Sequence, residues 1–139
     1  MGDRTDDTDL RLSILRLARR IRSMQADEAV THSQRSVLFA LEAAGPITLG
    51  ALSERERVTP PSMNRTIGAL VEAGLVSRSS TPDDARKVIL ALSDSGRGFV
   101  TETRRRRDEW FSTRLDALDP ADREALERAA AVLRTLADS

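Results

Sequence analysis

The sequence predicts a mainly α-helical fold that includes one small β-hairpin. Apolar residues recur at spacings of three and four over most of the chain, which is the period of a helix that buries one face. A period of two appears on either side of a turn-rich stretch that follows Ser80, as is typical of a hairpin. Aromatic residues make up 3% of the chain, so the core must consist of aliphatic side chains and alanine, which favours helices.

The composition limits the class of protein. The 139 residues suit one domain, expected over 10–139, after a polar, acidic and disordered lead over 1–9. Neither a signal peptide nor an apolar run of about 18 residues is present, so a cytoplasmic protein without membrane contact is expected. The chain has no cysteine, and His32 is its single histidine, so neither a metal nor another cofactor is expected.

The formal net charge is zero, but the charges are unevenly distributed. The first ten residues and the segment from Asp108 to the end are acidic, whereas the middle of the chain is basic. A basic middle segment is compatible with binding to a polyanion, although the total charge alone argues against it.

A heptad-like apolar stripe predicts a long first helix within 10–30, and this stripe needs a partner helix. Its residues are Leu10, Ile14, Leu17, Ile21 and Met24. A second helix is expected after a cap at Thr31 or Ser33, and Gly45 ends it. A short third helix follows Thr48.

The most clearly marked helix start lies at Thr59. The threonine oxygen can cap free N–H groups, and the following Pro60 and Pro61 have no N–H to leave unpaired in the first turn. This helix is expected to run to about Ala73, and Gly74 ends it.

After Gly74 the spacing of apolar residues changes from the helical period to a period of two, and two further helices follow. Residues 75–80 and 87–92 are expected to form the hairpin. A helix capped by Ser93 reaches about Asp116, and a last helix opens at Asp119. The apolar stripe of this last helix consists of Leu126, Ala130, Leu133 and Ala137.

Three short helices followed by a hairpin form the layout of a winged helix-turn-helix, in which the hairpin is the wing. In the helix that starts with the Thr-Pro-Pro motif, Met63, Ile67 and Leu70 point inward, and the outer residues are of types that read base edges. The candidate DNA contacts on this helix are Thr59, Pro61, Ser62, Asn64, Arg65 and Thr66. Asparagine can form a bidentate pair with adenine, and arginine with guanine.

The tip of the hairpin supplies a second candidate contact. Arg86 and Lys87 lie beside a turn that a minor groove could admit, where the negative potential attracts arginine. Asp84 is placed to hold Arg86. The alternative is that the helix face and the loop are simply solvated.

Residues 34–97 resemble the MarR family of bacterial and archaeal transcriptional regulators. The similar stretches are 34–38 at the start of the second helix, 58–65 with 74–76 in the recognition helix and its exit, and 84–86 with 92–97 in the wing. One departure from the family pattern is Glu56-Arg57, where such turns often carry Leu-Gly. Arg57 is therefore a candidate phosphate contact.

This resemblance implies a winged domain at about 34–97 and dimerisation helices at about 10–30 and 98–138. It implies a homodimer on double-stranded DNA with a palindromic operator, whose half-sites lie about 10 base pairs apart. A repressor role and release by a small aromatic acid are also implied. A regulator that responds to no ligand, and a winged-helix module that contacts only proteins, are the alternatives.

Four consecutive arginines, 104–107, lie on one predicted helix and surround nearly its whole circumference. At least one of them should face protein and need a partner. An acidic residue of the last segment across the dimer interface is the expected partner, and an anionic ligand is the rarer alternative.

An enzyme is not expected. The chain has no glycine-rich phosphate loop and no cysteine, and its single histidine leaves no catalytic triad. The neighbouring carboxylates of Asp83 and Asp84 lie in a turn, which suits a wing better than acid–base catalysis.

Overall fold

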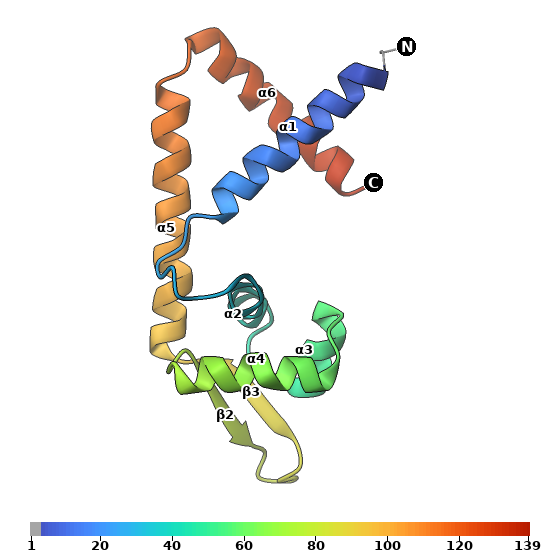
Figure 1. Ribbon diagram of the computed structural model, residues 1–139, viewed down its shortest axis with the longest axis vertical. Helices are drawn as coiled ribbons and strands as arrows, with labels where there is room; N and C mark the ends of the chain where they lie inside the picture. Colours follow the sequence, from blue (N-terminus) through green and yellow to red (C-terminus); the bar gives the residue numbers. More distant parts are fainter. Residues whose placement is uncertain (1–3) are drawn as a thin grey trace. The chain divides into compact units, whose positions relative to one another are not determined.

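The computed structural model describes residues 4–139 as a mainly helical protein with a three-stranded antiparallel sheet (Figure 1). The helices are α1 (Arg4–Arg22), α2 (His32–Ala44), α3 (Leu49–Glu56), α4 (Pro60–Glu72), α5 (Asp94–Asp116) and α6 (Pro120–Ala137). The strands are β1 (Ile47–Thr48), β2 (Val76–Ser80) and β3 (Val88–Leu92). The predicted fold class is confirmed.

The chain divides into two compact units. The first is Gln25–Arg105, which is wider than the predicted 34–97 window, and the second combines the residues up to Met24 with Arg106–Ser139. In the described residues no helix is long and apolar enough to cross a membrane.

The core of the Gln25–Arg105 unit is aliphatic, as the low aromatic content predicted. The buried faces of α2, α3 and α4 form one core together with residues of β2, β3 and the start of α5. The largest fully buried side chains are Leu38, Leu41, Leu52, Met63, Ile67, Leu70, Leu90, Val100 and Thr103. Removing such side chains from water is the main force that holds α4 in place, and the opposite face of α4 is left in solvent.

A reciprocal cap starts α2. Thr31 Oγ1 accepts a hydrogen bond from the Gln34 backbone N–H at 3.2 Å, and Gln34 Oε1 accepts one from the Thr31 N–H at 3.0 Å. Such a capping box satisfies two backbone donors that the helix itself cannot pair. Of the two caps that the sequence allowed, Thr31 rather than Ser33 is the one used.

The predicted first helix, 10–30, ends earlier, at Arg22. Gln25 is buried, and its Nε2 donates to the carbonyl oxygens of Asp27 at 2.7 Å and of Val30 at 2.8 Å. These bonds hold the chain in a turn, so the helix cannot continue through this segment.

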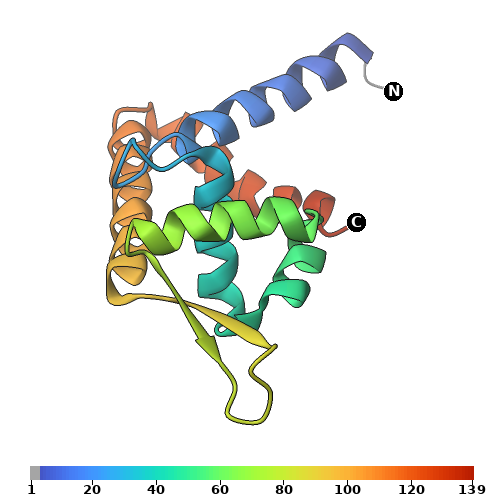
Figure 2. The ribbon, with the colours of Figure 1, turned by 60° about the horizontal axis from the view of Figure 1, so that its bottom comes forward.

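The hairpin forms where the period of two predicted it, and Figure 2 shows it projecting beyond the helices of its unit. The third strand, β1, was not predicted. Its Ile47 pairs with Leu90 and its Thr48 with Ile89. A two-residue strand shows no period in sequence, because only the pairing with β3 defines it.

The turn between α3 and α4 contains a residue in a strained conformation. Arg57 has a φ of 53° and a ψ of 44°, the left-handed region, and it is the C-cap of α3. A side chain costs about 1–2 kcal/mol there, which is why glycine is usual at such a position. The departure from the family pattern at Glu56-Arg57 therefore does not change the turn, because Arg57 adopts the glycine conformation.

We expect Arg57→Gly to raise the free energy of unfolding by about 0.5 to 1 kcal/mol, since the strain relieved exceeds the extra chain entropy of glycine. Urea denaturation followed by circular dichroism measures the change. Arg55→Gly is the matched control, because Arg55 lies within α3 and glycine there should cost about 1 kcal/mol. Equal losses in both variants would contradict the strain at position 57.

Where β3 passes into α5, the backbone packs closely against the end of α4. Ser93 Oγ donates to the Gly74 carbonyl at 2.6 Å, and the Ser93 N–H donates to the Leu75 carbonyl at 3.1 Å. Gly96 is buried there, and a Cβ at this position would lie 2.1 Å from the Leu75 carbonyl oxygen. Only a glycine fits.

Helix α1 begins at Arg4, so the prediction of a disordered lead over 1–9 is wrong for residues 4–9. Residues 1–3 lie outside the described residues. Asp6 and Asp7 occupy the first turn of α1, where carboxylates are stabilised by the positive end of the helix dipole. Polar residues need no core of their own to extend a helix that an apolar stripe already supports.

The unit formed by the two ends of the chain exposes much apolar surface. Helices α1 and α6 have no buried residue among those described. The exposed large apolar side chains are Leu10, Leu12, Ile14, Leu15, Leu17, Leu118, Leu126, Val132, Leu133 and Leu136. Ten such side chains on one small unit form more apolar surface than an isolated protein usually leaves in water.

Two of the consecutive arginines pair with carboxylates of the Gln25–Arg105 unit. Arg104 forms two hydrogen bonds with the Glu42 carboxylate, at 2.9 and 2.8 Å, and this ion pair lowers the pKa of Glu42. Arg105 pairs with Glu102 on its own helix at 2.9 Å. Neither of these two carboxylates belongs to the acidic last segment, and a partner across a dimer interface stays a prediction. Net charge by segment does not show which residues folding brings together, and Glu42 lies on α2.

Arg107 instead binds backbone. Its Nε donates to the Met24 carbonyl at 3.1 Å and its Nη2 to the Arg22 carbonyl at 3.2 Å. The Arg22 carbonyl ends α1, where the helix has no N–H group left to pair with it, and Met24 lies two residues beyond. Arg107 therefore holds the backbone where the first helix ends, and an acidic partner across a dimer interface stays a prediction.

Candidate nucleic-acid interface

Helix α4 starts where the sequence predicted. Thr59 is its N-cap, with Oγ1 accepting from the Ser62 N–H at 3.4 Å, and Pro60 and Pro61 form its first turn. Met63, Ile67 and Leu70 are buried, as expected. The remaining candidate contacts lie on the outer face: Pro61, Asn64 and Arg65 are exposed, and Ser62 and Thr66 are half-buried.

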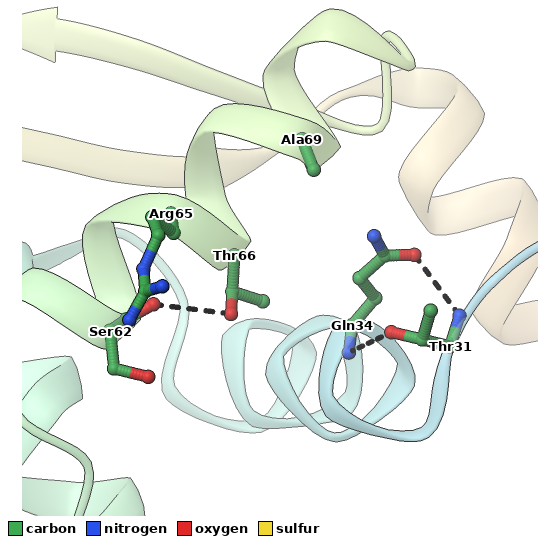
Figure 3. Close-up of a pocket in the computed structure, with 6 residues that line it drawn as sticks. All are labelled: Thr31, Gln34, Ser62, Arg65, Thr66 and Ala69. Carbon is green, nitrogen blue, oxygen red and sulfur yellow. Dashed lines mark hydrogen bonds between the residues drawn. The ribbon is translucent and has the colours of Figure 1, made fainter.

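A shallow depression of about 370 Å³ separates this outer face of α4 from the start of α2 (Figure 3). It is lined by Thr31, Gln34, Ser62, Arg65, Thr66 and Ala69. The Thr66 hydroxyl donates to the Ser62 carbonyl at 3.3 Å, so it is used within the helix. The α2 N-terminus, with its positive dipole end, and the Arg65 guanidinium both lie at this depression, which makes it suitable for a phosphate group.

The wing tip is a turn that is held by its own residues. Thr81 Oγ1 donates to the Asp84 carbonyl at 2.9 Å and accepts from the Asp84 N–H at 3.1 Å. Asp84 Oδ1 accepts from the Arg86 N–H at 2.9 Å, and the Lys87 N–H donates to the Asp84 carbonyl at 3.1 Å. Asp84 therefore shapes the turn, and this is the contact through which it holds Arg86.

The Arg86 side chain is 97% exposed, and its Nε lies 4.0 Å from Asp84 Oδ1, a weak contact in water. Lys87 next to it is also exposed. Two cationic side chains thus project from the tip of the hairpin without being held to the body of the unit. Such an arrangement can enter a groove of negative potential.

Sequence reasoning missed Arg78, which connects the wing with α4. Its Nη2 donates to Asn64 Oδ1 at 3.0 Å and lies 3.4 Å from the Asn64 carbonyl oxygen. The signal was available, because alternate residues of a strand share a face and Val76, two positions earlier, is buried in the core. The side chain of Arg78 therefore extends from the core-facing side of β2 towards α4.

In the Gln25–Arg105 unit, polar and cationic side chains gather on one helix, α4, and on the hairpin. DNA-binding proteins of the winged helix-turn-helix class use these same two elements. Asn64 and Arg65 stand on the outer face of α4, while Arg86 and Lys87 stand on the hairpin. A helix of this kind fits the major groove, and a neighbouring hairpin reaches the backbone or the minor groove beside it.

Comparison with known proteins agrees with this chemistry. A sequence model of the MarR family matches residues 30–88. An HTH-type transcriptional regulator of Mycobacterium tuberculosis is 41% identical over 131 residues, which are 94% of this chain and 92% of that protein.

Solved structures extend the similarity to the whole chain. RV1404 from Mycobacterium tuberculosis has a TM-score of 0.84 and 29% identity, covering 97% of this chain and 94% of that one. BpsR of Bordetella bronchiseptica, whose DNA binding is regulated by 6-hydroxynicotinic acid, has a TM-score of 0.60 and 25% identity, covering 96% and 98%. By its sequence, its relatives and its winged fold, this chain belongs to the MarR family of transcriptional regulators, and it binds DNA.

Proposed function

We propose that this protein is a repressor that binds a palindromic operator as a homodimer. The observation that carries the proposal is the pair of exposed arginines, Arg65 on the polar outer face of α4 and Arg86 on the hairpin. The DNA contacts are then Thr59, Pro61, Ser62, Asn64, Arg65, Thr66, Arg86 and Lys87, with Asp84 as the residue that shapes the turn.

The exposed apolar surface of α1 and α6 supports the dimer. Residues of both helices line a groove of about 310 Å³. They are Asp7, Leu10, Arg11, Ile14, Leu15 and Leu136. A second copy of the chain buries such a surface by presenting the same one, which is the arrangement of a two-fold symmetric interface. A dimer also places two copies of α4 on the DNA, and a palindromic site matches that symmetry.

The proposal also includes the release of the repressor from DNA by a small aromatic acid. It is supported by BpsR, whose DNA binding is regulated by 6-hydroxynicotinic acid. The arginines that suggested an anionic ligand do not add support, because Arg104 pairs with Glu42, Arg105 pairs with Glu102 and Arg107 binds backbone. A regulator that responds to no ligand is the second candidate.

The testing experiment is a footprint of the purified protein on the DNA upstream of its own gene, with Arg65→Ala and Arg86→Ala as variants. We expect two protected half-sites about 10 base pairs apart, and a loss of affinity of about tenfold in each variant. Arg134→Ala is the matched control, since Arg134 is an exposed arginine of α6. It should leave the footprint unchanged.

The dimer should persist in all three variants, as measured by sedimentation. If Arg65→Ala and Arg86→Ala bind DNA as tightly as the unmodified protein, the assignment of the contact residues is wrong. Adding 6-hydroxynicotinic acid or benzoate to the footprint separates the two candidates, because a ligand-responsive repressor loses protection and a ligand-insensitive one keeps it.

A further inference from the structure

The hydrogen bond between Arg78 and Asn64 determines which atoms of Asn64 face outward. Arginine carries only hydrogen-bond donors, so the oxygen of the Asn64 amide, and not its nitrogen, must face the guanidinium. The 3.0 Å distance from Nη2 to Oδ1 fits this arrangement. The amino group of Asn64, with its two donors, is then the part of the side chain that is free to meet a partner.

This orientation changes the chemistry that the sequence predicted for Asn64. A bidentate pair with adenine requires Oδ1 to accept from the adenine amino group while Nδ2 donates to N7. A cationic guanidinium that already donates to Oδ1 competes with the adenine amino group for that oxygen. Guanine presents two acceptors in the major groove, N7 and O6, and both can accept from an amino group.

We propose that Arg78 is a positioning residue that sets the base preference of Asn64, directing it to guanine instead of adenine. The inference rests on the proposed role of α4 in reading the operator. It makes the wing part of the sequence readout in the major groove, because β2 holds the residue that orients a base reader on α4.

The surroundings of Arg78 keep its guanidinium at this place. The Arg78 side chain follows Val76 on the core-facing side of β2, so its stem starts beside the apolar core. The guanidinium lies beside α4 at Gly68, where a Cβ would be 3.9 Å from Arg78 Nη2, an ordinary van der Waals contact. The bond is exposed to water in the free protein. DNA covering α4 would exclude that water and strengthen the bond.

The experiment selects bound duplexes from a randomised pool and reads base preference at each position for four proteins. These are the unmodified chain, Arg78→Met, Arg78→Lys and Asn64→Ala. The position read by Asn64 is the one at which Asn64→Ala loses discrimination. At this position we expect guanine for the unmodified chain, a shift towards adenine of about fivefold or more in Arg78→Met, and retention of guanine in Arg78→Lys, which keeps a donor.

The double variant Asn64→Ala with Arg78→Met tests whether Arg78 acts through Asn64. If it does, Arg78→Met produces no further change of base preference in the Asn64→Ala background. A uniform loss of affinity for all sequences, with the salt slope reduced by about one, would make Arg78 a phosphate contact and overturn the inference. Adenine preference in the unmodified chain would overturn it as well.

The same selection experiment distinguishes failure of the proposed function from failure of the role of Arg78. If the unmodified chain selects no sequence at all from the pool, the operator-reading role itself is wrong, and this inference falls with it. If the unmodified chain selects a clear operator but Asn64→Ala and Arg78→Met leave every position unchanged, the proposed function stands and only the role of Arg78 is refuted.

Discussion

Gly96→Ala is expected to lower the free energy of unfolding by about 3 kcal/mol, which corresponds to a fall in Tm of about 10 °C. The added Cβ would lie 2.1 Å from the Leu75 carbonyl oxygen and 3.2 Å from Leu92 Cδ2. The carbonyl belongs to the backbone that leads into the wing and also accepts from the Ser93 N–H, so it cannot move without breaking that bond.

Gly98→Ala is the matched control for this substitution. Gly98 lies two residues further along α5, is exposed, and has open space where its Cβ would be. Alanine there should raise the free energy of unfolding by about 0.5 to 1 kcal/mol, because it is the better helix former. Thermal unfolding followed by circular dichroism compares the two variants, and equal stabilities would mean that the close approach at Gly96 does not exist.

The double variant Leu10→Glu with Leu136→Glu is expected to be a monomer that has lost operator binding. Both leucines line the apolar groove of α1 and α6, and their exposed fractions are 61% and 62%. In a symmetric dimer each substitution occurs twice, so the lost burial amounts to at least about 4 kcal/mol, or roughly a thousandfold in the dissociation constant. Analytical ultracentrifugation measures the dimer, and gel shift with operator DNA measures the binding.

Ala131→Glu controls for the added charge. Ala131 is exposed on α6 and lies on the side of the helix away from the apolar stripe. This variant should remain a dimer with unchanged affinity for DNA. A double leucine variant that sediments as a dimer would show that the apolar groove is not the interface, whatever the effect on DNA binding.

The sequence predicted those helices and strands that are marked by residues within or next to the element itself. The start of α4 at Thr59 was predictable because threonine and proline act through their own chemistry, and its end because Gly74, with a φ of 77°, supplies the left-handed residue that follows the helix. The hairpin was predictable from its alternation. The winged layout follows from these elements in their order along the chain.

The parts that sequence reasoning missed or misjudged depend on contacts between distant residues. Arg104 meets Glu42, and Arg78 meets Asn64, across long separations in sequence. Strand period places Arg78 on the same side of β2 as Val76, but it does not identify Asn64 as the partner. The strand β1 exists only through its pairing with β3. In the candidate site, the exposed residues of α4 could be predicted from helical period, but the direction in which the Asn64 amide faces could not.

The hairpin tip is held by hydrogen bonds among its own residues, which affects how it can change in evolution or by design. The turn bonds in this segment connect Thr81, Asp84, Arg86 and Lys87 to one another. We therefore expect that the segment 81–87 can be exchanged for that of another regulator without disturbing the core, which would alter the proposed minor-groove contact of Arg86. The base of the same hairpin is not interchangeable in this way, because Arg78 ties it to α4. The tip of the hairpin can thus change independently, whereas a change near Arg78 also affects α4.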